Sequence, residues 1–273
     1  MLMQTFPLNY FSHLNSPRRL FAGRRQLSWP KLSLIFLFLV ALMVMPITMY
    51  YTNQVKAIPM EQFLTVHQLI DQDGVNKFLE LPMENGQINH SPITIYQNNE
   101  ILIGSGLTKE QKNEKNAFID FAKNHWTIQQ KEQGRIRTYQ MNYQASFNPE
   151  SVRTPQEFQA FLEQEFYASN RPMIILSYSM SLGIILFIMT SFILFGASFF
   201  LWLTRKSRFS SIQTFKESAN LMLNVIGVGS IIATIVGFFY FDFVLMLGIQ
   251  STVSVLLLLW IFAKTGFKDE VKA

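Results

Sequence analysis

Four long apolar runs constrain the fold of this chain more than any other feature of its sequence. None of them contains Asp, Glu, Lys or Arg, and they cover residues 32–51, 173–203, 221–241 and 243–263. A bilayer core about 30 Å thick needs about 20 helical residues, so each run is long enough to cross a membrane. Only Asp242 separates the last two runs, which predicts a tight hairpin between two antiparallel spans.

The composition agrees with a chain whose surroundings are partly hydrocarbon. Hydrophobic residues make up 49% of it and charged residues 15%, against about 25% charged in soluble domains. This excludes an ordinary cytosolic enzyme. There is no cysteine, which excludes disulfides, thiolate metal sites and cysteine nucleophiles.

Charge is distributed unevenly between the segments that connect the apolar runs. The segments before the first run, between the second and third, and after the fourth hold 12 basic and 3 acidic residues. The long segment 52–172 holds 11 basic and 14 acidic residues. By the positive-inside rule we expect residues 52–172 outside the cell and both termini in the cytoplasm. The net charge of +5 is then a topology signal, and no nucleic-acid partner is expected.

An alternative for residues 1–57 is a cleaved signal peptide, because Val55-Lys56-Ala57 has small residues at the right spacing. We disfavour it because the apolar run is about twice the usual length of 7–15 residues. An uncleaved membrane anchor fits better.

The predicted fold class is an α-helical polytopic membrane protein with four transmembrane helices and a small extracellular α+β insert domain. The predicted location is the cell membrane, multi-pass, with both termini cytoplasmic. In chain order we expect a cytoplasmic N-terminal segment (1–31), transmembrane helix 1 (32–51), the extracellular α+β domain (52–172), transmembrane helix 2 (173–203), a cytoplasmic amphipathic elbow (204–220), transmembrane helix 3 (221–241), transmembrane helix 4 (243–263) and a cytoplasmic tail (264–273).

The insert domain is long enough for one small core. A first helix is predicted from Pro59 to a turn at Asp73-Gly74. Alternating patterns then predict an antiparallel sheet with strands at 93–97, 100–104, 117–121, 126–130 and 135–144. Thr154, Pro155 and Glu157 form a capping-box sequence that predicts a last helix, running to the membrane at Pro172.

A search for catalytic groups finds no phosphate-binding glycine loop, no zinc-type histidine pair and no nucleophile elbow. His67, His90 and His125 are scattered, and we interpret them as solvated or packed side chains. Asp242 is interpreted as a turn residue, with an ion pathway as the less favoured alternative. We therefore expect no enzyme activity, no cofactor and no metal site.

Two sets of residues are candidates for binding or packing. Gly229, Ala233 and Gly237 recur every four residues and predict a smooth helix surface on the third span. Its counterpart would be Gly248 and Thr252 on the fourth span, and a homo-oligomer is the alternative.

Aromatic side chains in the predicted strands suggest a surface on which a sugar could stack. They are Trp126, Tyr139 and Tyr143. Aromatic residues in strands more often belong to a core, so this platform is the minority interpretation.

Two short motifs carry a resemblance to a known family. The first is Tyr10-Phe11 followed by Ser16-Pro17-Arg18-Arg19, and the second is Ser211 with Phe215-Lys216-Glu217. With the layout of four spans and an external insert, the chain resembles a family of four-span membrane proteins of maltodextrin-utilisation operons in Gram-positive bacteria. The resemblance implies an auxiliary role in the use of maltodextrins such as maltotetraose, and it brings no catalytic residue.

We therefore expect a non-enzymatic integral membrane accessory protein that aids uptake or sensing of maltodextrin. Its expected partners are the lipid bilayer and a maltodextrin importer. The alternative is a small solute transporter or pore, acting alone or as a homodimer. A membrane enzyme is the weakest hypothesis, since its site would have to be assembled from His67, His90, His125 and Asp120.

Overall fold

The computed structural model describes residue 10 and residues 16–55, 64–84, 87–88, 92–132, 134–144, 147–206 and 210–269. The chain forms two compact units. One consists of Met1–Gln54 with Ile175–Ala273, and the other of Val55–Ile174. The predicted insert domain corresponds closely to the second unit.

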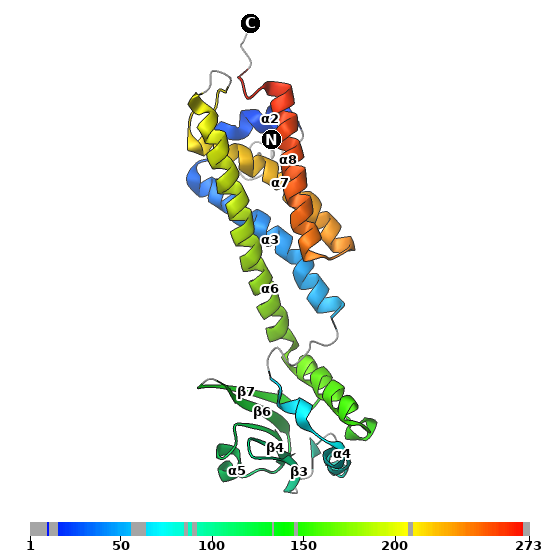
Figure 1. Cartoon of the computed structure of the whole chain (residues 1–273). Helices are drawn as coiled ribbons and strands as arrows, with labels where there is room; N and C mark the ends of the chain where they lie inside the picture. Colours follow the sequence, from blue (N-terminus) through cyan, green and yellow to red (C-terminus); the bar gives the residue numbers. More distant parts are fainter. Residues whose placement is uncertain are drawn as a thin grey trace. The chain divides into compact units, whose positions relative to one another are not determined.

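Within the described residues, four helices are long and apolar enough to cross a membrane (Figure 1). Each contains one of the four apolar runs or nearly all of it. They are α3 (Trp29–Asn53), α6 (Pro155–Leu203), α7 (Phe215–Phe239) and α8 (Phe243–Thr265). Asp242 caps α8, because its carboxylate accepts a hydrogen bond from the amide of Leu245 at 2.7 Å. This is the turn role expected for Asp242.

Helix α6 differs from the prediction at Pro172. We expected one helix to end there and another to begin, but α6 is a single helix of 49 residues. Pro172 has no N–H to donate to the carbonyl of Ala168. Two residues earlier, Asn170 Nδ2 donates to the carbonyl oxygen of Phe166 at 2.9 Å, so this side chain adds a hydrogen bond to the backbone beside the proline.

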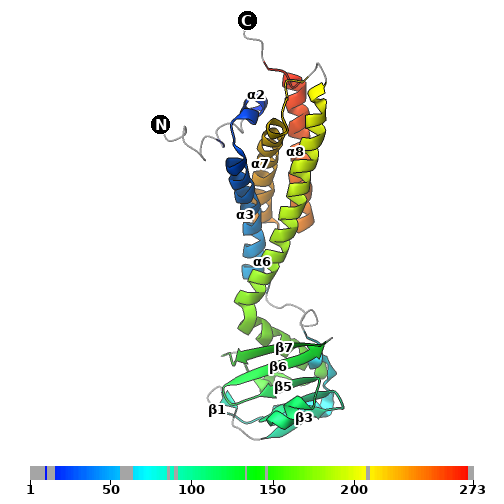
Figure 2. The ribbon, with the colours of Figure 1, turned by 90° about the vertical axis from the view of Figure 1, so that its left-hand side faces the viewer.

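Helix α7 is the central helix of the helical unit. In its most apolar stretch 67% of residues are buried, against 22% in α8. It contacts α3 and α8, and Figure 2 shows it between them. The residues predicted for close packing lie in these contacts. A Cβ on Gly229 would lie 2.6 Å from the carbonyl oxygen of Gln250, and one on Gly237 would lie 2.7 Å from Met246 Sδ.

The counterpart of this surface on α8 differs from the prediction. Gly248 has no atom within 4 Å of an added Cβ, and Thr252 is exposed. The facing residues are instead Met246, Gln250 and Ser254. Gln250 is buried, donates to Ser230 Oγ at 2.8 Å and accepts from Thr190 Oγ1 at 3.4 Å, so it joins α6, α7 and α8.

The second unit is an α+β domain. Before the sheet come a 3₁₀ turn η4 (Val66–Leu69), α4 (Gln72–Leu79) and the short pair β1 (Met83–Glu84) and β2 (Gln87–Ile88). The main sheet has the order β3-β4-β5-β6-β7 (Figure 2), with a 3₁₀ turn η5 (Pro149–Ser151) before α6. Its strands are β3 (Ile93–Gln97), β4 (Ile101–Ser105), β5 (Ala117–Phe121), β6 (His125–Glu132) and β7 (Arg135–Asn142).

The prediction of an all-antiparallel sheet is wrong at one pair. Strands β4 and β5 are parallel, with Ile101 opposite Ala117. The connection between them contains helix α5 (Lys109–Asn113). This helix begins with a capping box formed by Thr108 and Gln111. A helix in the connection carries the chain back to the same end of the sheet, so the two strands run in the same direction.

The first helix of this domain also differs from the prediction. Asp73-Gly74 was expected to end a helix, whereas both residues lie in the first turn of α4. Asp71 starts this helix, since its carboxylate accepts from the amide of Gly74 at 2.8 Å. The start predicted at Pro59 lies outside the described residues.

The capping-box prediction for α6 is confirmed. The amide of Glu157 donates to Thr154 Oγ1, and the amide of Thr154 donates to Glu157 Oε2, both at 3.2 Å. Phe158 and Phe166, on this first part of α6, are buried in the domain core.

Candidate functional site

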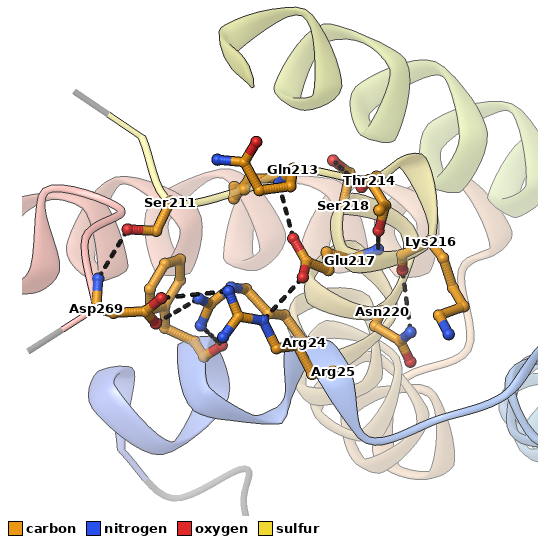
Figure 3. A network of polar contacts seen from close by, with 12 residues as sticks. Arg24, Arg25, Ser211, Gln213, Thr214, Lys216, Glu217, Ser218, Asn220 and Asp269 are labelled. Atoms are coloured by element: carbon orange, nitrogen blue, oxygen red, sulfur yellow. Dashed lines mark hydrogen bonds and ion pairs between the residues drawn. The ribbon is translucent and has the colours of Figure 1, made fainter. Parts of the chain in front are cut away.

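A network of polar contacts in the helical unit lies where three segments that are distant in the sequence meet (Figure 3). These segments are α2 (Pro17–Ala22) with the 3₁₀ turn η2 (Gly23–Arg25), residues 210–217 at the start of α7, and residues 265–269 after α8. We call this region the junction. Ser16 starts α2 by accepting a hydrogen bond from the amide of Arg19.

Two consecutive arginines connect the three segments. Arg24 pairs with Asp269, and Arg25 pairs with Glu217 at 2.8 Å and with Asp269 at 3.2 Å. The Arg24 side chain is only 2% exposed, and its guanidinium also lies 3.9 Å from the centre of the Phe21 ring. The N-terminal segment is therefore held to both later segments by charge.

Arg24 and Arg25 lower the pKa of Asp269. Burial alone would raise the pKa of Asp269, but the hydrogen bond from Arg24 and the charges of Arg24 and Arg25 hold it below its ordinary value. Because the pKa is lower in the folded protein than in the unfolded chain, this stabilisation is present at neutral pH. It is lost as the pH falls through the folded value.

The turn after α8 has an unusual backbone that the junction supports. Gly266 and Phe267 both have φ of 54°, in the left-handed region that disfavours a side chain such as phenylalanine. Phe267 is nevertheless held on several sides. Its amide donates to Thr265 Oγ1 at 3.1 Å, its carbonyl accepts from the amide of Ser211 at 2.8 Å, and its ring lies 6.0 Å from that of Phe21.

Several residues that carry the family resemblance make contacts in the junction or next to it. Tyr10 donates from its hydroxyl to the carbonyl of Leu223 at 3.0 Å, on α7 beyond the junction. Ser211 accepts through Oγ from the amide of Asp269 at 3.0 Å, and Glu217 binds Arg25. Ser16 of the first motif and Ser211 and Glu217 of the second, which lie far apart in the sequence, thus belong to the junction. Phe11 lies outside the described residues.

Sequence analysis missed Asp269 of the junction and Asn220, which follows the junction on α7. Asp269 was counted only as a charge of the tail, although it binds both arginines. Asn220 donates to the carbonyl of Leu27 at 3.1 Å. Asn224 is a polar residue in the apolar run 221–241, which predicts a bond between helices, and it donates to the carbonyl of Leu20 at 3.1 Å.

The predicted amphipathic elbow at 204–220 is replaced by this junction. Residues 204–206 form a 3₁₀ turn, residues 210–214 are not helical, and α7 already begins at Phe215. Ile212 and Ala219, which would form part of the apolar face of such an elbow, are fully buried in the helical unit. The part of the elbow at 207–209 lies outside the described residues.

A charge-removal variant tests the junction. We expect Glu217→Gln to speed trypsin cleavage at Arg25 of the detergent-solubilised protein, by at most about fivefold, because a half-exposed ion pair contributes up to about 1 kcal/mol. In the parent protein, the amide of Gln213 donates a hydrogen bond to Glu217 Oε2 at 2.7 Å. A glutamine at position 217 can still accept this hydrogen bond through its side-chain oxygen, so the variant changes only the charge. Glu157→Gln, at the same capping position of α6, is the matched control. Equal cleavage of Glu217→Gln and parent would contradict the role of the pair.

The three residues of the predicted sugar platform lie in different surroundings. The Trp126 side chain is fully buried, 6.1 Å from the Phe121 ring and 6.4 Å from the Phe147 ring. Tyr143 is half-buried, also against Phe147, and donates to the carbonyl of Ala122 at 2.6 Å. The ring of Tyr139 contacts Phe166 instead. A fully buried indole presents no face to a sugar, so Trp126 fits the core interpretation.

Two of the scattered polar residues of the insert, His67 and Asp120, each have a partner of their own. His67 is buried and lies 3.2 Å from Glu163 Oε1, while Asp120 accepts from Lys112 Nζ at 2.5 Å. His125 is the first residue of β6, and His90 lies outside the described residues. In the described part of the chain no three His, Asp or Glu side chains are grouped so that they could hold a metal ion.

Comparison with known proteins gives one clear match. A curated protein of Streptococcus pneumoniae (strain ATCC BAA-255 / R6), the maltodextrose utilization protein MalA, is 28% identical to this chain over 273 residues. The match covers 98% of each chain. The resemblance to maltodextrin-utilisation proteins is confirmed. No protein-family model and no solved structure matches the chain.

Proposed function

We propose that the protein is a non-enzymatic integral membrane protein that assists maltodextrin utilisation, by aiding uptake or sensing. The observation that carries the proposal is the similarity to the maltodextrose utilization protein along 98% of both chains. A match of this extent includes the four apolar helices and the α+β insert together. The role therefore belongs to the whole arrangement rather than to one module.

The proposed location is the cell membrane, with the insert domain outside and both termini in the cytoplasm. The four apolar helices support crossing of a membrane. The excess of basic residues in the segments 1–31, 204–220 and 264–273 supports the orientation. An external domain of this kind could contact a maltodextrin or the extracellular side of an importer.

Growth on a defined sugar tests the function. We expect deletion of the gene to slow growth on maltotetraose and to leave growth on glucose unchanged, with the intact gene supplied in trans restoring it. The reason is that the proposed assistance acts on maltodextrins, so the entry of glucose does not depend on this protein. Equal growth of deletion strain and parent on both sugars would contradict the proposal.

Uptake of radiolabelled maltotetraose distinguishes a protein that aids uptake from one that acts in sensing. If the protein aids uptake, the deletion lowers the initial uptake rate even when the importer is expressed from a constitutive promoter. If the protein acts in sensing, constitutive expression restores the rate. Entry of maltotetraose into liposomes that hold the purified protein alone would contradict an accessory role and favour the alternative, a transporter.

A further inference from the structure

A pocket of about 510 Å³ lies beside the junction, within the helical unit. Its walls come from α2, η2 and the end of α8, with Phe21 and Ala22 on the apolar side. Among the described residues, five basic residues and one acidic residue line it, and they are Arg18, Arg19, Arg24, Lys264, Lys268 and Asp269. Cations from both ends of the sequence therefore surround one shared space.

The balance of charge in this lining favours an anion. Asp269, the one acidic residue in the described part of this lining, already binds Arg24 and Arg25. Like charges around one cavity repel one another, and an anion placed between them lowers the free energy of the whole group. Basic pockets between membrane helices at the cytoplasmic side are a known form of lipid headgroup site.

Arg24 provides a second, independent observation. Its Nη1 donates to the carbonyl of Phe21 at 3.1 Å and its Nη2 to Asp269. Its Nε is buried and has no hydrogen-bond partner among the described residues. A buried donor without a partner is costly, and a guanidinium fork matches the oxygens of a phosphate group.

Membrane topology alone does not account for this arrangement. The positive-inside rule needs basic residues on one side of the membrane, but it does not require them to gather around one cavity. It also does not require burial, whereas Arg24 is 2% exposed. Lys206 and Lys216 satisfy the topological requirement on exposed positions outside the pocket lining.

We propose that this pocket is a binding site for an anion of the phosphate class. The anion is either the headgroup of an acidic phospholipid or a small soluble phosphate, because both present the same oxygens to the basic side chains. The site goes beyond the proposed role in maltodextrin utilisation and does not depend on it. Binding is measured on the purified protein, whereas that role is measured by growth and uptake.

The test uses the full-length protein in a non-ionic detergent. Native mass spectrometry measures retention of phosphatidylglycerol and of phosphatidylcholine, and equilibrium dialysis measures binding of radiolabelled inorganic phosphate. The variant Lys264→Gln with Lys268→Gln removes two ammonium groups from the lining without touching the Arg24 ion pair. Lys206→Gln with Lys216→Gln is the matched control, because it removes the same two charges from exposed positions outside the lining.

We expect the protein to retain at least one of the two anionic probes in preference to phosphatidylcholine. The pocket variant should weaken that binding by on the order of tenfold or more, since each basic residue near an anionic surface contributes about 1 kcal/mol. The control variant should bind as the parent does. Retention of phosphatidylglycerol alone assigns a lipid headgroup, and binding of inorganic phosphate assigns a soluble ligand.

Three results would overturn the site. They are no preference of the parent for either anionic probe, equal weakening in the pocket and control variants, and binding that the pocket variant leaves unchanged. If the pocket variant does not fold, the salt dependence of anion binding to the parent protein still tests the proposal. Its anion binding must then weaken between about 50 and 200 mM sodium chloride, as ion screening requires, and salt-independent retention would overturn the proposal.

Discussion

Replacing Phe78 by alanine is expected to unfold the α+β domain in a large share of molecules. The side chain is fully buried, and its ring lies 5.2 Å from Phe121, 5.0 Å from Phe158 and 6.0 Å from Phe161. Loss of a buried phenylalanine costs about 3–5 kcal/mol, which is most of the stability of a small domain at the lower end of the usual range of about 5–15 kcal/mol.

Protease added to intact, wall-stripped cells measures this effect. We expect rapid cleavage within residues 64–174 of the Phe78→Ala variant and slow cleavage of the parent. Ile136→Ala is the matched control, because Ile136 is 63% exposed on β7 and its loss should change stability by less than about 0.5 kcal/mol. Equal cleavage of both variants would contradict the role of Phe78 in the core. If the two variants differ only after the cells are lysed, the proposed orientation is reversed.

The second large effect is expected from Gly229→Ala in the helical unit. The added methyl group would lie 2.6 Å from the carbonyl oxygen of Gln250 and 3.0 Å from Ser254 Oγ. To make room, α7 and α8 must separate, which strains the hydrogen bond from Gln250 Nε2 to Ser230 Oγ. Such overpacking costs about 1–3 kcal/mol.

The thermal midpoint of the purified protein in mild detergent measures this cost. Gly248→Ala on the facing helix is the matched control, because no atom lies within 4 Å of its added Cβ. It should leave the midpoint unchanged or raise it slightly, since alanine favours a helix more than glycine does. A midpoint that falls equally in both variants would show that close approach at Gly229 is not what stabilises the bundle.

Much of the fold could be predicted because hydrocarbon length and capping chemistry act locally. The four apolar helices follow from uncharged runs, and α6 begins at Pro155 because Thr154 and Glu157 form its capping box. The direction of β5 could not be read in the same way, since strand direction depends on the connection. A hint was present, because the residues of β4 and β5 are buried on both faces, as in parallel strands, and read as nearly continuous apolar runs.

The junction was only partly predictable, for a different physical reason. Motifs around Ser16 and Glu217 drew attention to both segments, but nothing local in the sequence shows that they touch. The contacts of Arg25 with Glu217 and of Arg24 with Asp269 join residues 192 and 245 positions apart. The burial of Arg24 also runs against the usual exposure of arginine, so only the assembled helices reveal it.

These sequence separations impose an order on biosynthesis. Arg24 leaves the ribosome early, yet its carboxylate partner is made 245 residues later, after all four long helices. The ion pair between Arg24 and Asp269 can therefore form only after nearly the whole chain has been synthesised. A stalled or truncated nascent chain that stops short of Asp269 would leave that arginine without its counter-charge, and a fusion attached directly after residue 269 would disturb the same closing step.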